Sequence, residues 1–287
     1  MTPGRRLREL LSTGETILVP GAYNALVARV LEQAGFGAIY SGGYGAAAAT
    51  YGLPDIGIMT GTEMTDHVAR ITSSVAVPVI ADADTGYGEL VNVARTVREF
   101  ERAGAAAVQI EDQTFPKRCG HMEGKQVIPR DEMVKKVRAA LAARADDGTV
   151  IIARTDAIAV TGLEDALARM QAYAEAGADV IFPDAPRSVD ELRTIAAVVD
   201  RPLVANMSEH GKTPLLSREE IRDLGYAIAL YPSSTLFAAA QSAREVAELL
   251  IRDGTTRNGL DRILEFNEFN ELVGLTAWQA EEERAAR

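Results

Sequence analysis

A short segment around the single cysteine concentrates side chains that could do chemistry. Cations and a histidine surround the thiol between two glycines; in chain order these residues are Lys117, Arg118, Cys119, Gly120, His121 and Gly124. Positive neighbours lower the pKa of a thiol and suit it to proton transfer. The glycines let such a loop move, as in lids that exclude water from a reaction. We therefore expect Cys119, with Lys117 and His121 beside it, to be catalytic.

Three other roles compete for Cys119. A lone cysteine is most often a small buried hydrophobe, but the charged neighbours argue against that role here. A covalent nucleophile paired with histidine needs none of the acidic residues described next. A zinc site is disfavoured because one cysteine and three histidines make a poor ligand set.

Four carboxylates follow two neighbouring apolar runs of the chain: Asp82 and Asp84 after one, Glu111 and Asp112 after the next. Ordinary surface acids are the alternative, but four acids that converge repel one another unless a cation lies among them. Mg²⁺ suits such a site because it keeps several waters and leaves positions for substrate oxygens; Mn²⁺ remains open. Asp82 and Asp84 share one face of a strand, so one could bind the metal and the other a metal-bound water.

Two further segments favour an anionic substrate. Ser41-Gly42-Gly43 offers a hydroxyl and unobstructed backbone N–H groups that could cradle a carboxylate or phosphate, although the same residues also form simple turns. Arg154 follows a later apolar run and could grip a carboxylate bidentately. The alternative for Arg154 is a structural salt bridge to one of the acids.

The elements that must position these residues alternate regularly along the chain. Eight short apolar runs have the length of buried parallel strands: 17–20, 38–41, 78–83, 106–111, 150–155, 179–183, 202–206 and 227–231. Amphipathic helical stretches lie between them, at 25–33, 91–103, 130–145, 163–176, 188–199 and 217–224. Eight unbroken βα units predict a single (β/α)₈ TIM-type barrel, with active-site residues at the carboxyl ends of the strands. An open doubly wound sheet is the alternative, but no Gly-x-Gly-x-x-Gly follows the first run.

No low-complexity linker divides the chain, so residues 1–287 are expected to form one barrel domain. A helical extension at about 240–287 exceeds what one closing helix needs. It either caps the barrel or packs on a neighbouring subunit.

The composition excludes several classes of partner. A net charge of −11 and a pI near 4.9 argue against nucleic acid or an anionic membrane surface. The sequence shows neither the apolar core of a signal peptide nor a run long enough for a membrane helix. One cysteine cannot form an internal disulfide, which fits a reducing cytoplasm.

The chain resembles the isocitrate lyase/phosphoenolpyruvate mutase superfamily from about Gly4 to the C-terminal helices. Within it, the closest resemblance is to the short bacterial 2-methylisocitrate lyases and the 2,3-dimethylmalate lyases. The segments that carry the resemblance include Tyr40-Ser41-Gly42-Gly43, Gly52-Leu53-Pro54-Asp55, Asp82-Ala83-Asp84-Thr85-Gly86, Ile110-Glu111-Asp112-Gln113, Lys117-Arg118-Cys119-Gly120-His121, Ala153-Arg154-Thr155-Asp156-Ala157 and Tyr231-Pro232.

The resemblance implies a role for each group of residues. The residue matching Asp84 binds Mg²⁺ directly, and those matching Asp82, Glu111 and Asp112 surround its waters. The residue matching Cys119 protonates the enolate of the departing acid. The remaining matches contact substrate: Ser41, Gly42, Gly43, Asp55 and Arg154 at the α-keto acid half, and His121, Asn206 and Ser234 at the other carboxylates.

The implied reaction is a retro-aldol cleavage of a 2-hydroxy di- or tricarboxylate into an α-keto acid, such as pyruvate, and a second carboxylic acid. The general base stays open between Tyr40, Tyr44 and a metal-bound water. The resemblance also implies a homotetramer, a dimer of dimers in which the C-terminal helix is exchanged between subunits.

Two departures from the 2-methylisocitrate lyases bear on the substrate. Asp184 replaces their glutamate after the sixth run, and Phe237 stands where an arginine would grip an extra carboxylate. These changes favour a dicarboxylate such as an alkylmalate, or oxaloacetate by hydrolysis or decarboxylation. A carboxyphosphonoenolpyruvate-type phosphonomutase is the remaining alternative, and a metabolite-binding barrel without activity would not need the thiol.

Overall fold

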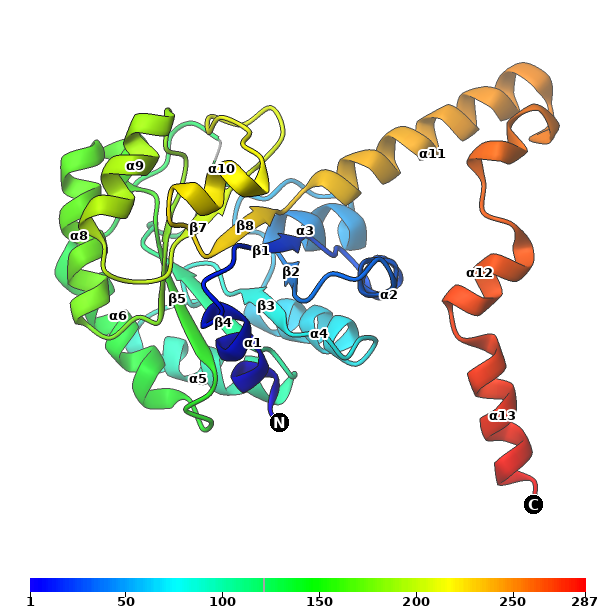
Figure 1. Cartoon of the computed structure of the whole chain (residues 1–287), viewed down its shortest axis with the longest axis horizontal. Coiled ribbons are helices and arrows are strands. Elements are labelled where there is room, and N and C mark those ends of the chain that lie inside the picture. The colour runs from blue at the N-terminus through cyan, green and yellow to red at the C-terminus, as the bar shows by residue number, and fades with distance from the viewer. Residues whose placement is uncertain (121) are drawn as a thin grey trace. The chain divides into compact units, whose positions relative to one another are not determined.

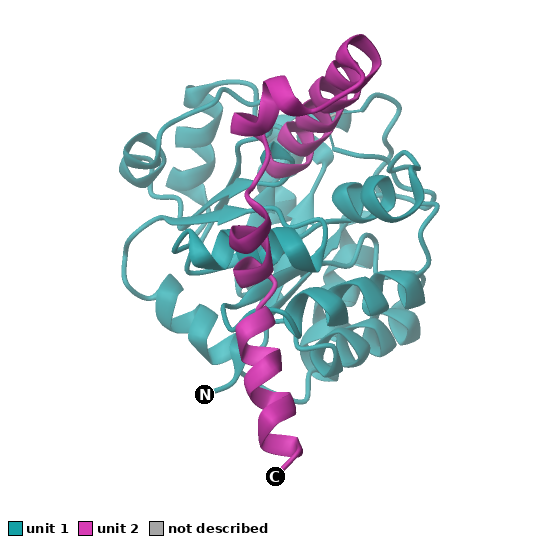
Figure 2. Cartoon of the chain, turned by 90° about the vertical axis from the view of Figure 1, so that its right-hand side faces the viewer, with its two compact units in different colours: residues 1–234 teal, residues 235–287 magenta. Residues whose placement is uncertain are grey.

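The computed structural model describes residues 1–120 and 122–287. It divides the chain into two compact units, Met1–Ser234 and Thr235–Arg287, which Figure 2 colours teal and magenta. Nearly all of the buried apolar side chains belong to the first unit.

The first unit contains eight parallel strands among the described residues. They are β1 (Ile17–Pro20), β2 (Ile39–Ser41), β3 (Val79–Asp82), β4 (Ala107–Glu111), β5 (Val150–Thr155), β6 (Val180–Pro183), β7 (Val204–Asn206) and β8 (Ile228–Tyr231). Each lies within two residues of its predicted run. The predicted α/β fold with parallel strands is therefore confirmed.

The strands pair in two sheets that meet at both edges. One sheet has the order β1-β8-β7 and the other β2-β3-β4-β5-β6. A bridge between Gly21 and Tyr40 joins β1 to β2, and a bridge between Ile181 and Leu203 joins β6 to β7. The ring of strands is thus closed, and no open edge of the kind a doubly wound sheet presents remains.

Helices connect and surround these strands (Figure 1). The first unit has α1 (Pro3–Leu11), α2 (Ala25–Gln33), α3 (Gly43–Tyr51), α4 (Gly61–Thr72), α5 (Leu90–Arg102), α6 (Arg130–Ala143), α7 (Ala157–Val160), α8 (Leu163–Glu175), α9 (Val189–Val198) and α10 (Arg218–Asp223). Helices α1, α3, α4 and α7 were not among the predicted elements. The alanine- and glycine-rich α3 has no amphipathic period, whereas α4 begins with a capping box of Thr60 and Glu63 that could have been recognised.

Alternation along the strands separates the barrel interior from the layer under the helices. Alternate strand residues such as Val19, Ile80, Ile152 and Leu230 form one interior cluster, which Leu7 of α1 joins. The residues between them pack against the surrounding helices. Toward the carboxyl ends, the interior positions change from apolar to polar: Asp82, Gln109, Glu111 and Arg154.

The second unit is helical. It contains α11 (Ser234–Asp253, beginning at the last residue of the first unit), a 3₁₀ segment (Arg257–Arg262), α12 (Phe266–Leu272) and α13 (Leu275–Ala285). Large apolar side chains of this unit are exposed: Phe237, Leu250, Ile251, Leu260, Ile263, Leu264, Phe266, Phe269, Leu275 and Trp278. No helix within the described residues is both long and apolar enough to span a membrane.

The interior apolar cluster of the barrel, which contains Leu7, gives a first prediction. Leu7 is fully buried, so Leu7→Ala removes packed methyl groups and is expected to lower the free energy of unfolding by about 2–5 kcal/mol. Urea denaturation followed by circular dichroism measures the change. Val91→Ala is the matched control, because Val91 is 79% exposed and its loss should change stability by no more than about 0.5 kcal/mol. Equal effects of the two substitutions would contradict the assignment of Leu7 to the core.

Candidate active site

A buried lysine joins two of the predicted site residues at the carboxyl end of the barrel. Lys117 Nζ lies 2.6 Å from Asp55 Oδ1 and 2.6 Å from Asp84 Oδ1. Burial alone would lower the pKa of Lys117, but Asp84, Glu111 and Asp55 raise it well above its usual value. The lysine is therefore a fixed positive charge between carboxylates.

Asp82 is held by hydrogen bonds to both carboxylate oxygens. Its Oδ1 accepts from the backbone N–H of Asp84 at 3.1 Å and from Gln109 Nε2 at 3.2 Å. Its Oδ2 accepts from the backbone N–H of Gly43 at 3.2 Å. A Cβ at Gly43 would lie 3.3 Å from Asp84 Oδ1, so the missing side chain lets the start of α3 approach the acids. The structure thus brings Gly43 to the acid cluster.

Ser41 and Gly42 lie beside this contact, at the end of β2. A Cβ at Gly42 would lie 2.6 Å from Tyr40 Cε1, so the tyrosine ring fills the space next to the glycine. Ser41 is buried, and its Oγ has no hydrogen-bond partner among the described residues. A buried hydroxyl without a partner is a site that a ligand oxygen can satisfy.

Burial disfavours the ionised forms of Asp84 and Glu111. Burial, together with Asp82 and Asp55, raises the pKa of Asp84 to about 7 against the opposing effect of Lys117. Burial also raises the pKa of Glu111 well above its usual value, against the opposing effect of Arg154. Within the described chain, the buried Glu111 Oε1 accepts no hydrogen bond. An additional positive charge would favour the ionised form of both groups.

The donor set fits a hard divalent cation. Asp55, Asp82, Asp84 and Glu111 offer only carboxylate oxygens, which Mg²⁺ prefers. In the part of the chain that the structure describes, no three acidic, histidine or cysteine side chains converge closely enough to bind an ion directly. This spacing is compatible only with a cation that takes few direct protein ligands and retains several waters, as Mg²⁺ does.

Asp112 is not part of this cluster, contrary to its predicted place among the metal residues. It follows Glu111 and points to the opposite side of β4, where Oδ2 accepts from Thr155 Oγ1 at 2.7 Å and from Tyr173 Oη at 2.8 Å. Oδ1 accepts from the backbone N–H of Asp156 at 3.0 Å. Consecutive strand residues face opposite sides, so the two acids could not both reach the interior. Asp112 ties β4 to β5 and α8.

Arg154 is engaged by several carboxylates. It pairs with Asp156 through Nε at 2.9 Å and Nη2 at 3.0 Å, and its Nε lies 3.3 Å from Glu111 Oε2. Its Nη2 lies 3.4 Å from Asp184 Oδ2, and the guanidinium stacks over the Phe182 ring at 5.1 Å. Arg154 and Lys125 outweigh burial and hold the pKa of Asp156 well below its usual value. The structural salt bridge considered for Arg154 is thus present. The Arg154–Asp156 pair also holds the guanidinium at the carboxyl end of the barrel.

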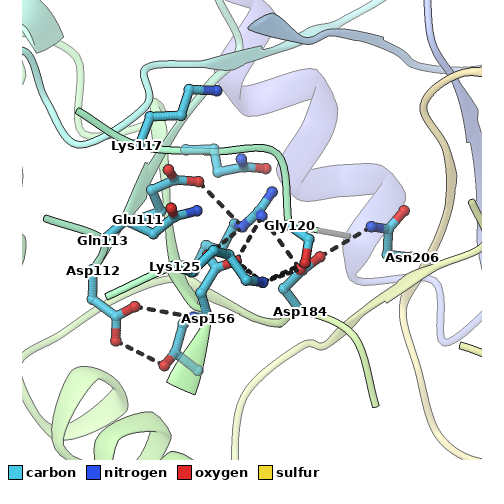
Figure 3. A network of polar contacts seen from close by, with 12 residues as sticks. Glu111, Asp112, Gln113, Lys117, Gly120, Lys125, Asp156, Asp184 and Asn206 are labelled. Carbon is cyan, nitrogen blue, oxygen red and sulfur yellow. Dashed lines mark hydrogen bonds and ion pairs between the residues drawn. The ribbon is translucent and has the colours of Figure 1, made fainter. Parts of the chain in front are cut away.

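Asp184 joins the same polar network (Figure 3). Its Oδ1 accepts from Asn206 Nδ2 at 3.1 Å. Lys125 Nζ lies 3.5 Å from Asp184 Oδ2 and 2.8 Å from Asp156 Oδ1. Asp184, directly after β6, and Asn206 of β7 are therefore adjacent, and Asp184 also lies next to Arg154.

The loop that carries Cys119 is fastened to the acid cluster. The backbone N–H of Cys119 donates to the carbonyl of Asp55 at 3.1 Å. Gln113 holds the loop base, because its Nε2 donates to the Arg118 carbonyl and its Oε1 accepts from the Arg118 N–H. Cys119 is half-buried. His121 lies outside the described residues, so its predicted role stays a prediction.

The environment of the two tyrosines disfavours them as general bases. Tyr40 Oη donates to Gln109 Oε1 at 3.3 Å, and burial followed by Asp82 raises its pKa well above 10. Burial, Cys119 and Asp55 raise the pKa of Tyr44. An efficient base has a pKa near the working pH, so neither phenol is poised to accept a proton.

The end of β8 carries the last predicted substrate residue. Ser234 donates a hydrogen bond to Glu209 Oε1, so this hydroxyl is held by the loop after β7. Phe237 belongs to the second unit and is 39% exposed. That Phe237 stands where the 2-methylisocitrate lyases carry an arginine stays an expectation from the sequence.

Sequence reasoning assigned no role to Gln109, Lys125 or Asp156. Asp156 could have been found, because it lies two residues after Arg154 and so on the same face of the chain. Gln109 is similarly two residues before Glu111. Lys125 had no such signal, since its contacts depend on how the loop folds back.

Relatives are similar over nearly the whole chain. It is 44% identical over 275 residues to the 2,3-dimethylmalate lyase of Eubacterium barkeri, covering 96% of this chain and 95% of that protein. It is 45% identical over 285 residues to the 2-methylisocitrate lyase of Aeropyrum pernix, covering 99% and 92%. These named lyases support the assignment of the chain as a carbon–carbon lyase.

Solved structures agree with this placement. An oxaloacetate acetylhydrolase bound to 3,3-difluorooxalacetate superposes with a TM-score of 0.95 at 36% identity, covering 99% of this chain and 97% of that one. A phosphonopyruvate hydrolase bound to oxalate and Mg²⁺ superposes with a TM-score of 0.90 at 36% identity, with full coverage of both chains. The barrel therefore matches TIM-barrel-type enzymes that bind small carboxylates.

The family model for phosphoenolpyruvate phosphomutase matches residues 7–251, so the chain belongs to the phosphoenolpyruvate mutase/isocitrate lyase superfamily.

Proposed function

We propose that the protein cleaves a carbon–carbon bond of a 2-hydroxy dicarboxylate, releasing an α-keto acid such as pyruvate and a second carboxylic acid. One observation carries the proposal: a single loop brings both Cys119 and Lys117 to the acid cluster. The Cys119 N–H contacts the Asp55 carbonyl, and Lys117 pairs with Asp55 and Asp84. A thiol held beside a carboxylate-rich site is suited to protonating a carbanionic product.

The residues divide the reaction between them. Transfer of the 2-hydroxy proton to a water of the site and cleavage of the adjacent C–C bond would leave an α-keto acid and an enolate, and Cys119 would donate its thiol proton to the enolate carbon. Ser41 Oγ, the Gly42–Gly43 backbone and Arg154 hold the α-keto acid half, whose developing charge they stabilise. Neither Tyr40 nor Tyr44 is assigned as the base. His121 is proposed to act beside Cys119.

Asp84, Asp82, Glu111 and Asp55 would hold the divalent cation. Mg²⁺ supplies electrophilic stabilisation of the α-keto acid oxygens when bound, and Mn²⁺ shares the same oxygen ligands. The phosphonopyruvate hydrolase that superposes on this chain was solved with Mg²⁺ and oxalate, which supports this choice.

Two residues favour a dicarboxylate over a tricarboxylate. Asp184 is one methylene shorter than the glutamate of 2-methylisocitrate lyases, and Phe237 lacks the charge that would balance a third carboxylate. Asn206 and Ser234 offer polar groups for the distal carboxylate. A substrate of the 2,3-dimethylmalate type fits this charge balance. Oxaloacetate hydrolysis is the second candidate, favoured by the similarity to oxaloacetate acetylhydrolase.

The exposed apolar side chains of the second unit support a homotetramer. Helices with so many exposed large apolar groups are expected to pack on another copy of the chain. We place the protein in the cytoplasm, because its single cysteine fits a reducing compartment.

Substrate turnover tests the activity. Purified protein with Mg²⁺ is expected to release pyruvate from 2,3-dimethylmalate and to act less efficiently on 2-methylisocitrate. Pyruvate release is measured as NADH oxidation by coupled lactate dehydrogenase. Parallel assays with oxaloacetate and phosphonopyruvate separate the hydrolase and phosphonate alternatives. If no 2-hydroxy di- or tricarboxylate is turned over, the lyase proposal is wrong.

The acid role of Cys119 predicts a specific defect in Cys119→Ser. A hydroxyl is a far weaker acid than a thiol, so kcat should fall by roughly 10²–10⁴-fold. Affinity for a substrate analogue, measured by isothermal titration calorimetry, should change little. Lys135→Met, at an exposed position of α6, is the control. Full turnover in Cys119→Ser would refute the proposed acid.

The metal site can be tested without turnover. Mg²⁺ binding measured by calorimetry should be lost or weakened by at least about tenfold in Asp84→Asn, because one ligand charge is removed. Asp112→Asn serves as the contrast, since its contacts lie on the other side of β4. Activity that persists after complete chelation with EDTA would remove the metal from the mechanism.

A further inference from the structure

Lys125 lies buried where the cysteine loop meets the ends of β5 and β6. Its ammonium contacts three groups: the Gly120 carbonyl, Asp156 Oδ1 at 2.8 Å and Asp184 Oδ2 at 3.5 Å (Figure 3). Its side chain is 2% exposed, and those of both carboxylate partners are fully buried. Hydrogen bonds that involve an ion are stronger than neutral ones, and burial protects them from screening by salt.

Gly120, which follows Cys119 in the sequence, provides the backbone carbonyl that accepts from Lys125. A Cβ at Gly120 would overlap Asp184 Oδ2 and Arg154 Nη2. The loop backbone therefore rests directly on the Arg154–Asp184 pair, and only glycine permits this approach. Gly120 does not have a positive φ, so the requirement is steric and does not come from the backbone conformation.

The outer part of the loop is held more weakly. Glu123 pairs with Lys212 at 2.6 Å, but the glutamate side chain is 88% exposed. Exposed ion pairs contribute little, because water and salt screen them. The buried Lys125 contact is thus the stronger of the two attachments.

We infer that Lys125 is a positioning residue for Cys119: its ammonium fastens the Gly120 carbonyl to Asp156 and Asp184, and so sets the place of the thiol over the site. The inference rests on the proposed acid role of Cys119 for its functional meaning. The contact itself can be tested without any substrate. Lys125 neither donates the proton nor contacts the reacting atoms in this scheme.

The single cysteine provides a direct readout of the loop. Alkylation by iodoacetamide, followed by intact mass spectrometry, labels Cys119 alone. Lys125→Met keeps the length of the side chain and removes the ammonium. We expect the alkylation rate to rise by roughly 10–100-fold, the change that corresponds to losing one hydrogen bond to a charged group. Loss of a nearby cation would by itself lower the thiolate fraction and slow alkylation, so a rise reports opening of the loop.

Gly120→Ala disrupts the same Lys125–Gly120 contact, because the added Cβ overlaps Asp184 and Arg154, and it leaves every charge in place. It should also accelerate alkylation, and the double variant should fall short of the product of the two single effects, because both remove one shared contact. Lys135→Met is the matched control, at an exposed position. The midpoint of thermal unfolding, measured for each variant, separates loop opening from global unfolding; if Lys125→Met does not fold, Gly120→Ala decides.

Turnover gives the second readout. In an active preparation, Lys125→Met should lower kcat while KM stays within about threefold, because the residue contacts the loop and not the substrate. Alkylation at the unchanged rate in both folded variants would overturn the inference even if the lyase is active. Faster alkylation in a protein that cleaves no substrate would leave the positioning role intact and reject the proposed function instead.

Discussion

Buried carboxylates outnumber buried cations at the mouth of the barrel, and this imbalance governs the site. Among the described residues, six buried acids of the network (Asp55, Asp82, Asp84, Glu111, Asp156 and Asp184) surround three buried cations (Lys117, Lys125 and Arg154). Buried charge is costly unless it is paired. The pairs therefore fix the side chains in place, and the unbalanced remainder, concentrated at Asp84 and Glu111, creates the demand for a further cation.

The network has two halves, and the cysteine loop touches both. Lys117 reaches into the half formed by Asp55 and Asp84, whereas Lys125 and Gly120 rest on the half formed by Asp156 and Asp184. Cys119 lies between these attachments in the sequence. A loop fixed at two points on either side of a reactive atom leaves that atom little freedom, which is what proton transfer at a defined position requires. The same contacts that neutralise buried acids thus also hold the backbone on both sides of Cys119.

The fold was largely predictable because the strands of a closed parallel barrel appear in the sequence as short apolar runs. Each strand is covered on both faces, so its residues are apolar regardless of the side they face. Two of the helices that were not predicted lack a comparably clear apolar pattern. The segment Gly43–Tyr51 has no amphipathic period, since small residues let α3 lie close to its neighbours instead of presenting an apolar stripe. Helix α1 is short: Leu7 enters the interior cluster, and Leu10 and Leu11 pack against that cluster.

The site was predictable in its chemistry but not in every partner. Position at a strand end identified Asp82, Asp84, Glu111 and Arg154, yet the same rule misplaced Asp112, because adjacent strand residues face opposite sides. Recognition of that alternation would have excluded Asp112 and pointed to Gln109. The loop contacts of Lys125 and Gly120 depend on a backbone that folds back between Gln113 and Val127, and no local pattern encodes that return.

The arrangement separates the bond-breaking chemistry from the choice of substrate. The acids, Lys117 and Arg154 are fixed by strand ends and by one another, so a change in any of them disturbs the charge balance of the whole network. Asn206 and Ser234 each donate a hydrogen bond to an acid, Asp184 and Glu209 respectively, and Phe237 lies on α11. Substitution at these uncharged positions leaves every charge at the centre in place. Asp184 keeps a charge at its position and Phe237 carries none, so the proposed preference for a dicarboxylate depends on these two residues without any change among the central charges.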